Sequence, residues 1–192
     1  MDQNEYSSIR SNLKTGDLVA FGGHTFISAS IKAITESNVS HVGMILKVKT
    51  AETYLPIIMI VESTSMGDGF AGVRISRLST RTSAYDGDIW ILPVTSAINQ
   101  GGVESFLVSK LGVPYDYIQA LGSAFDFPLF PDQKEDLDKL FCSELCNEVY
   151  SLNLLDSTSV SPNSSEQTPI DVCRLPIYLD VYQVSGSPKE LF

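Results

Sequence analysis

Three side chains in this sequence have the types that nucleophilic catalysis by a thiol requires: a thiol, a base, and a group that orients the base. His41 opens an apolar stretch, Glu62 ends another, and Cys142 lies in Phe141-Cys-Ser-Glu-Leu-Cys. Most chains contain all three residue types, so their presence alone indicates little. Their placement relative to the expected strands and helices is the informative observation.

His41 and Glu62 occupy positions that neighbouring antiparallel strands bring together. We expect strands over 40–48 and 55–61, with Glu62 directly after the second. Because the start of one antiparallel strand lies beside the end of the next, both side chains are predicted at one sheet edge. Glu62 would then accept a hydrogen bond from the imidazole and stabilise the imidazolium. The alternatives are a half-buried histidine without a chemical role and a carboxylate that ends its strand in solvent.

Cys142 precedes a stretch in which residues 142, 145, 146, 149 and 150 share one helical face. If the helix begins near Phe141, its free N–H groups lower the pKa of the thiol. If the helix extends back through 132–140, Cys142 is mid-helix and loses that effect. Buried structural cysteines are common, and Cys146 and Cys173 are expected to be structural or incidental.

Other chemistries have weaker support in the sequence. Cys142, Cys146 and His41 could in principle hold zinc, but there is no C-x-x-C pair and only one further histidine, His24, expected at the surface. The sequence also lacks a phosphate-binding glycine loop and a G-x-S-x-G serine motif. We therefore expect no metal and no cofactor.

The pattern of apolar residues predicts an α+β fold in a single domain spanning 1–192. Helices are expected over 3–14, 26–34, 103–111 and 142–150, and strands over 18–21, 40–48, 55–61, 73–78, 89–94 and 177–184. A further turn and short helix are expected after Pro114, and the Ser/Thr/Pro-rich stretch 156–169 is expected to be a loop.

Composition limits the possible partners and compartments. The formal net charge is −10, which argues against nucleic-acid binding, because that requires basic surfaces. The longest apolar run, at 54–61, is far shorter than the roughly 20 residues of a membrane-spanning helix. No signal peptide is recognised at the N-terminus, so we expect a cytoplasmic protein with free thiols.

Five sequence pieces together resemble the permuted papain-like amidases of the NlpC superfamily. They occur in the family's order over residues 15 to about 150: Thr15-Gly-Asp-Leu-Val, Ser40-His-Val-Gly-Met-Ile, Val61-Glu-Ser, Gly112-Val-Pro-Tyr-Asp-Tyr and Phe141-Cys-Ser-Glu-Leu. The resemblance implies a circularly permuted papain-like fold, in which an antiparallel sheet packs against helices and the nucleophile follows the histidine in sequence.

The resemblance also implies roles for individual residues. Cys142 would be the nucleophile, His41 the base and later the acid, and Glu62 the residue that orients the imidazole. Tyr115 and Asp116 would contact the substrate, although a turn with a packed ring is the simpler explanation for this pair. Asp17 is expected to be structural.

Three functions remain open at this stage. The first is a cysteine amidase or peptidase that acts through an acyl-enzyme. The second is a thiol acyltransferase or thioesterase for lipid or fatty-acyl substrates, with an apolar groove lined by aromatic and leucine residues at 125–130. The third is a non-catalytic module that binds a basic partner through the acidic segment 116–148. Neither the substrate, a small molecule, peptide or acyl compound, nor the oligomeric state follows from the sequence.

Overall fold

The computed structural model of the chain describes residues 3–49, 55–65, 68–95, 97–114, 141–156, 160 and 167–192. Tyr115, Asp116 and the aromatic cluster at 125–130 lie outside these residues, as do most of the acidic segment 116–148 and most of the stretch 156–169. The predictions made for these stretches therefore stay predictions.

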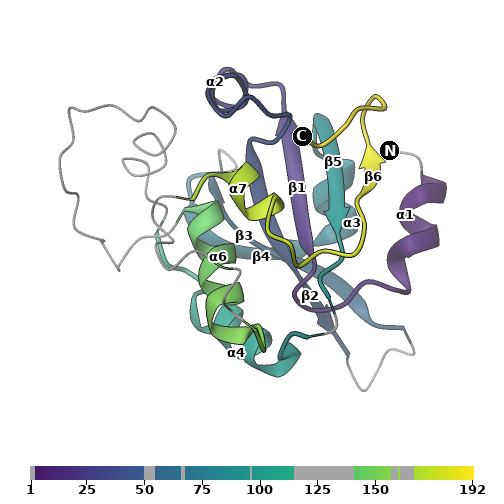
Figure 1. Cartoon of the computed structure of the whole chain (residues 1–192), viewed down its shortest axis with the longest axis vertical. Helices are drawn as coiled ribbons and strands as arrows, with labels where there is room; N and C mark the ends of the chain where they lie inside the picture. The colour runs from purple at the N-terminus through teal and green to yellow at the C-terminus, as the bar shows by residue number, and fades with distance from the viewer. Residues whose placement is uncertain are drawn as a thin grey trace.

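Six strands form one antiparallel sheet in the order β4-β3-β2-β1-β5-β6 (Figure 1). Every neighbouring pair is antiparallel. The strands are β1 (Leu18–Gly23), β2 (His41–Val48), β3 (Ile57–Ser65), β4 (Ala71–Arg77), β5 (Gly87–Leu92) and β6 (Tyr182–Ser185). The strand that begins at His41 is thus central, with a hydrogen-bonded neighbour on each side. This confirms an α+β fold with an antiparallel sheet packed against helices.

Helices cover both faces of the sheet, and this explains why its central strand β1 is apolar throughout. Alternate residues of a strand point to opposite faces, and all six residues of β1 are buried. On one face, Leu18 and Ala20 share a core with residues of α6 and α7, and on the other, Val19 and Phe21 share a core with residues of α1 and α3. The helices are α1 (Gln3–Arg10), α3 (Leu78–Ser83), α4 (Gln100–Ser109), α6 (Cys142–Asn153) and α7 (Pro169–Cys173).

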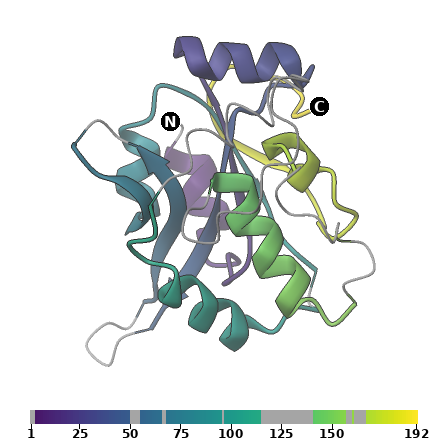
Figure 2. The ribbon, with the colours of Figure 1, turned by 90° about the vertical axis from the view of Figure 1, so that its left-hand side faces the viewer.

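One helix, α2 (Phe26–Ile34), lies across the end of the sheet where β1 ends and β2 begins (Figures 1 and 2). The hydroxyl of Thr25 caps it by accepting a hydrogen bond from the N–H of Ser28, at 3.2 Å. None of its residues is fully buried. The apolar repeat at 26–34 therefore predicted the helix correctly, but its apolar side chains have no buried face to fill.

Several elements differ from the expected ones: β1 runs on through Gly22 and Gly23, and Leu78, expected in a strand, begins α3. Strand β3 continues three residues beyond Glu62, to Ser65. The last strand is limited to Tyr182–Ser185, and Ile177 is instead buried in the core before it. The short helices α3 and α7 were not predicted, because six and five residues are too few for a helical repeat to be visible. No helix in the described part of the chain combines the length and apolar character needed to cross a membrane.

Candidate active site

His41 is held at the first position of β2, where the strand enters the sheet. Its cross-strand partner in β1 is Phe21, and the two ring centroids lie 5.5 Å apart. The imidazole side chain is 15% exposed. The aromatic neighbour and the regular backbone of β2 fix the ring while one edge remains accessible at the end of the sheet.

Glu62 is completely buried and reaches the imidazole from the neighbouring strand. Its Oε2 atom lies 2.8 Å from Nε2 of His41, and its side chain is 0% exposed. The prediction that these two side chains meet is confirmed, and the alternative of a carboxylate facing solvent is wrong.

Gly43 makes this contact possible. The register Met44↔Val61 places Gly43 opposite Glu62, so His41, two residues earlier on the same face, is the diagonal neighbour of Glu62. A Cβ atom on Gly43 would lie 3.0 Å from Cβ of Glu62 and 2.9 Å from Cδ1 of Ile60. The absence of a side chain at this position therefore leaves room for Glu62 and Ile60 where they lie.

Arg81 is a member of the site that the sequence reasoning missed. Its Nε donates to Oε1 of Glu62 at 2.6 Å, and its Nη2 donates to Oε2 at 3.1 Å. The guanidinium carbon lies 4.7 Å from the ring centroid of Phe21 and 4.9 Å from that of Tyr85. The short polar helix α3 gives no local sign of burial, since the groups that enclose Arg81 come from elsewhere in the chain.

Cys142 is the first residue of α6, because Phe141 is the extended N-cap residue. The alternative of a helix running back through residue 141 is therefore wrong. The imidazole of His41 and the backbone N–H groups of Val42 and Ser143 act on the thiol and lower its pKa. Because Glu62 engages Nε2 of His41, Nδ1 is the ring nitrogen left for the sulfur. Helix α6 packs on the sheet face opposite Glu62, so the ring is approached from both sides.

The charges of the site support one another. Burial disfavours the imidazolium, but the charge and hydrogen bond of Cys142, together with those of Glu62, outweigh it and raise the pKa of His41 to about 9. Burial also disfavours the thiolate, yet the His41 charge and the N–H donors lower the pKa of Cys142 below its usual value. Burial opposes ionisation of Glu62 as well, but His41 and Arg81 hold its pKa below the ordinary range. The arrangement favours a thiolate–imidazolium pair.

Among the described residues, the other sequence candidates lie apart from this set. His24 is exposed, with its Nδ1 3.4 Å from Oδ1 of Asp86. Cys146 and Cys173 are buried free thiols, and burial raises the pKa of both, which makes them unreactive. Asp17 is structural as expected: its carboxylate accepts the N–H of Lys14 at 2.8 Å and that of Val94 at 3.0 Å.

The donor set around His41 does not suit a metal ion. Within the described ranges, no group of three or more His, Cys, Asp and Glu residues is arranged to hold one. Both oxygens of Glu62 already accept hydrogen bonds from Arg81, whose positive charge would repel a cation. The side chains at this site are matched to each other rather than to a metal.

Comparisons with known proteins give a fold but no family. No family model matches the sequence, and no curated protein matches it either. Among solved structures, the metalloprotein yiiX from Escherichia coli O157:H7 is similar, with a TM-score of 0.60 and 18% sequence identity. The match covers 91% of this chain and 97% of that one. At this identity the likeness concerns the fold alone.

Proposed function

We propose that this protein is a cysteine hydrolase that cleaves an amide bond, with Cys142 as nucleophile, His41 as base and acid, and Glu62 as the orienting carboxylate. One observation carries the proposal: Nε2 of His41 lies 2.8 Å from the buried Glu62 carboxylate, and His41 and the helix-terminal thiol of Cys142 each favour the other's charged form. Three groups in contact in this order are what activation of a thiol needs.

The order of these groups along the chain supports a circularly permuted papain-like fold of the NlpC type. The sheet strands with His41 and Glu62 come first, and the helix that begins with Cys142 comes about 100 residues later and packs on that sheet. In papain-type enzymes the cysteine helix precedes the strands. The fold proposal rests on this reversed order and on the antiparallel sheet.

The reaction follows from the charges of the site. The Cys142 thiolate attacks the carbonyl carbon and forms a C–S bond, and the amide of Cys142, at the first position of α6, is suited to the developing oxyanion. Collapse of this intermediate breaks the C–N bond, and the His41 imidazolium gives its proton to the leaving amine. Neutral His41 then takes a proton from water, whose oxygen attacks the thioester. The C–S bond breaks, releasing the acid and restoring the thiolate.

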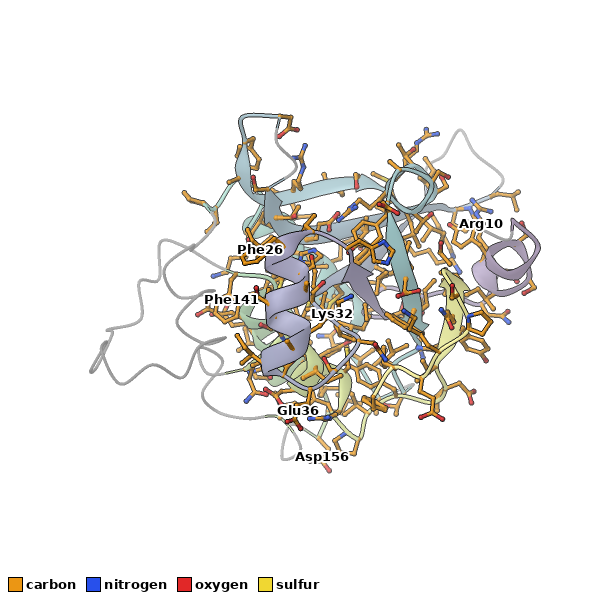
Figure 3. All side chains as sticks on the ribbon, turned by 90° about the horizontal axis from the view of Figure 1, so that it is seen from above. Arg10, Phe26, Lys32, Glu36, Phe141 and Asp156 are labelled. Carbon is orange, nitrogen blue, oxygen red and sulfur yellow. The ribbon has the colours of Figure 1, made fainter. Side chains whose placement is uncertain are left out.

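A second candidate function is acyl transfer or thioester hydrolysis on an apolar acyl substrate, and helix α2 favours it. Phe26 is 87% exposed and Ile27 is 62% exposed. Figure 3 looks down on this end of the molecule and shows α2 in front of the sheet, with Phe26 at one end of the helix. The helix connects β1 to the strand that begins with His41. An acyl chain near the thiol would meet this apolar surface.

The experiment that tests the proposal measures labelling of Cys142 by iodoacetamide from pH 5 to 9, with the modified residue identified by mass spectrometry. We expect fast labelling that persists well below the ordinary thiol pKa of about 8.5. The variant His41→Ala should lose the low-pH reactivity, and the variant His24→Ala, which changes the exposed histidine, should keep it. Slow labelling that titrates like a free thiol in all three proteins would refute the enzyme assignment.

A substrate panel then separates the two reactions. Amide and acyl-thioester substrates with short and long acyl groups are compared for the wild type and Cys142→Ser. Turnover of amides supports the hydrolase. A preference for long-chain thioesters, or transfer to an added amine in place of water, supports the second candidate.

A further inference from the structure

We propose that Arg81 is a positioning residue of this site. Its ion pair with Glu62 completes a buried chain of contacts between four charged groups, and this allows Cys142 and His41 to be ionised together. The catalytic consequence rests on the proposed function, but the chain of contacts does not. Arg81 touches neither the sulfur nor the imidazole in any described contact. Its influence runs through the carboxylate.

The contacts of Arg81 are those of a built site rather than a surface ion pair. The guanidinium is a planar fork, and here it binds both oxygens of one carboxylate. Its side chain is 13% exposed, against 0% for Glu62. The rings of Phe21 and Tyr85 lie near the guanidinium and fix its plane. Arginine suits this position because lysine offers no fork and stacks poorly on rings.

The signs of the four charges alternate along the chain of contacts. The thiolate of Cys142 meets the imidazolium of His41, which meets the carboxylate of Glu62, which meets the guanidinium of Arg81. The ionised set has no net charge. Without Arg81, the same set would have one uncompensated negative charge in a buried site, which is costly and favours taking up a proton. Without Glu62, it would have one excess positive charge and would release protons more readily.

Other titratable groups also face this chain of contacts, but none of them supplies a free charge that could replace the charge of Arg81. From the segment after α3, Tyr85 stays neutral, because burial raises its pKa to about 12. From α6 and α7, Cys146 and Cys173 stay protonated because burial raises their pKa values. On β4, the cross-strand neighbour Arg74 is held by Asp68 at 2.7 Å.

One more carboxylate acts on this region at longer range. Asp88, in β5, raises the pKa of Tyr85, and its Oδ2 lies 2.7 Å from Nζ of Lys189. This ion pair offsets its charge. Arg81 and His41 are therefore the two cations that balance Glu62 and Cys142.

The test follows the pKa of His41 itself by NMR, using the side-chain signals of the chain's only two histidines, His24 and His41. The proteins compared are the wild type, Arg81→Gln, Glu62→Gln and the double variant. A neighbouring charge in direct contact shifts a pKa by about 1–3 units, and we expect about 1 unit for Arg81, which acts through Glu62. The pKa of His41 should rise in Arg81→Gln, fall in Glu62→Gln and return toward the wild-type value in the double variant.

Two further variants separate charge from general damage. Arg81→Lys keeps the charge and loses the fork, so the His41 pKa should stay near the wild-type value. Arg10→Gln removes an arginine that donates to the Pro56 carbonyl at 3.0 Å, beside the opposite end of β3, and should leave the His41 pKa unchanged. If Arg81→Gln does not fold, the double variant is compared with Glu62→Gln instead. The pKa of His41 should again be higher in the protein that lacks the arginine.

The outcomes distinguish this inference from the proposed function. The charge-balance role would be overturned if the pKa of His41 shifted in the same direction in Arg81→Gln and Glu62→Gln, or if it shifted in neither variant. In Arg81→Gln the uncompensated negative charge should also raise the pKa of the Cys142 thiol, so the labelling rate of Cys142 at low pH should fall, by about tenfold for each unit of that rise. If Cys142 is unreactive while His41 follows the predicted pattern, the enzyme assignment fails and the role of Arg81 stands.

Discussion

Replacement of Gly43 by alanine tests whether the missing side chain at this position lets Glu62 reach the imidazole. Gly43 lies opposite Glu62 in the pairing of β2 and β3, and His41, the partner of that carboxylate, lies two residues earlier on the same face. Its backbone needs no special conformation, since its φ is not positive. Any effect of the substitution therefore comes from the space that the new methyl group occupies.

The contacts set the size of the effect. The new Cβ would lie 2.9 Å from Cδ1 of Ile60 and 3.0 Å from Cβ of Glu62. Both residues are 0% exposed, so neither has free space to move into. Overpacking of this kind costs about 1–3 kcal/mol. Displacement of Glu62 would also lengthen its 2.8 Å hydrogen bond to His41, and the pKa of His41 should then fall from its raised value.

Two measurements check this prediction. Urea denaturation should show a free energy of unfolding lower by about 1–3 kcal/mol, and NMR titration should show the lower His41 pKa. Gly101→Ala is the matched control, because a Cβ added at Gly101 has room: the nearest atom, Oδ1 of Asn99, would be 3.7 Å away. In helix α4 that change should stabilise by about 0.5–1 kcal/mol. An alanine at 43 that leaves both stability and the His41 titration unchanged would refute the reasoning.

Three other predictions follow from buried contacts. Cys142→Ala should lower the pKa of His41, because the thiolate charge and its hydrogen bond contribute most to raising it; the histidine NMR titration measures this. Burial raises the pKa of Asp17 to about 6 from 3.8, so the folded state binds its proton more tightly, and ionised Asp17 costs stability above pH 6. Compared with Asp17→Asn in urea, the wild type should therefore gain up to about 3 kcal/mol as the pH falls from 6 to below 4. Tyr150→Phe removes the hydroxyl that donates to the Gly16 carbonyl at 2.9 Å and should cost about 1–3 kcal/mol by the same method, whereas a cost near zero would mean that this carbonyl finds another donor.

The central part of the site could be predicted from the sequence because it depends on local patterns. An apolar strand that begins with a histidine and a second that contains a buried acid need only the antiparallel rule to be placed together. The start of α6 at Cys142 was one of two open alternatives, and the backbone of Phe141 decides it. The apolar run at 18–21 likewise predicted a strand, but not which elements cover its two faces.

Arg81 and the apolar surface of α2 could not be predicted, because each depends on partners distant in sequence. The burial of Arg81 depends on Phe21 and Glu62, about 60 and 20 positions earlier, and nothing in the neighbouring residues of α3 signals it. A helical repeat of apolar residues predicts a helix at 26–34, yet it does not say what covers that face. The exposure of Phe26 is a property of the tertiary arrangement alone.

The separation of the reacting groups along the chain has a consequence during synthesis. His41 and Glu62 are 21 positions apart and lie on consecutive strands, so a growing chain can bring them together early. Cys142 follows His41 by 101 positions and meets the imidazole only when α6 has packed on the sheet. Contacts of such long range form slowly, after the loop-closure entropy has been overcome. Until then the sulfur is an ordinary thiol with a pKa of about 8.5, so a nascent or partly unfolded chain does not present the proposed nucleophile in its activated form.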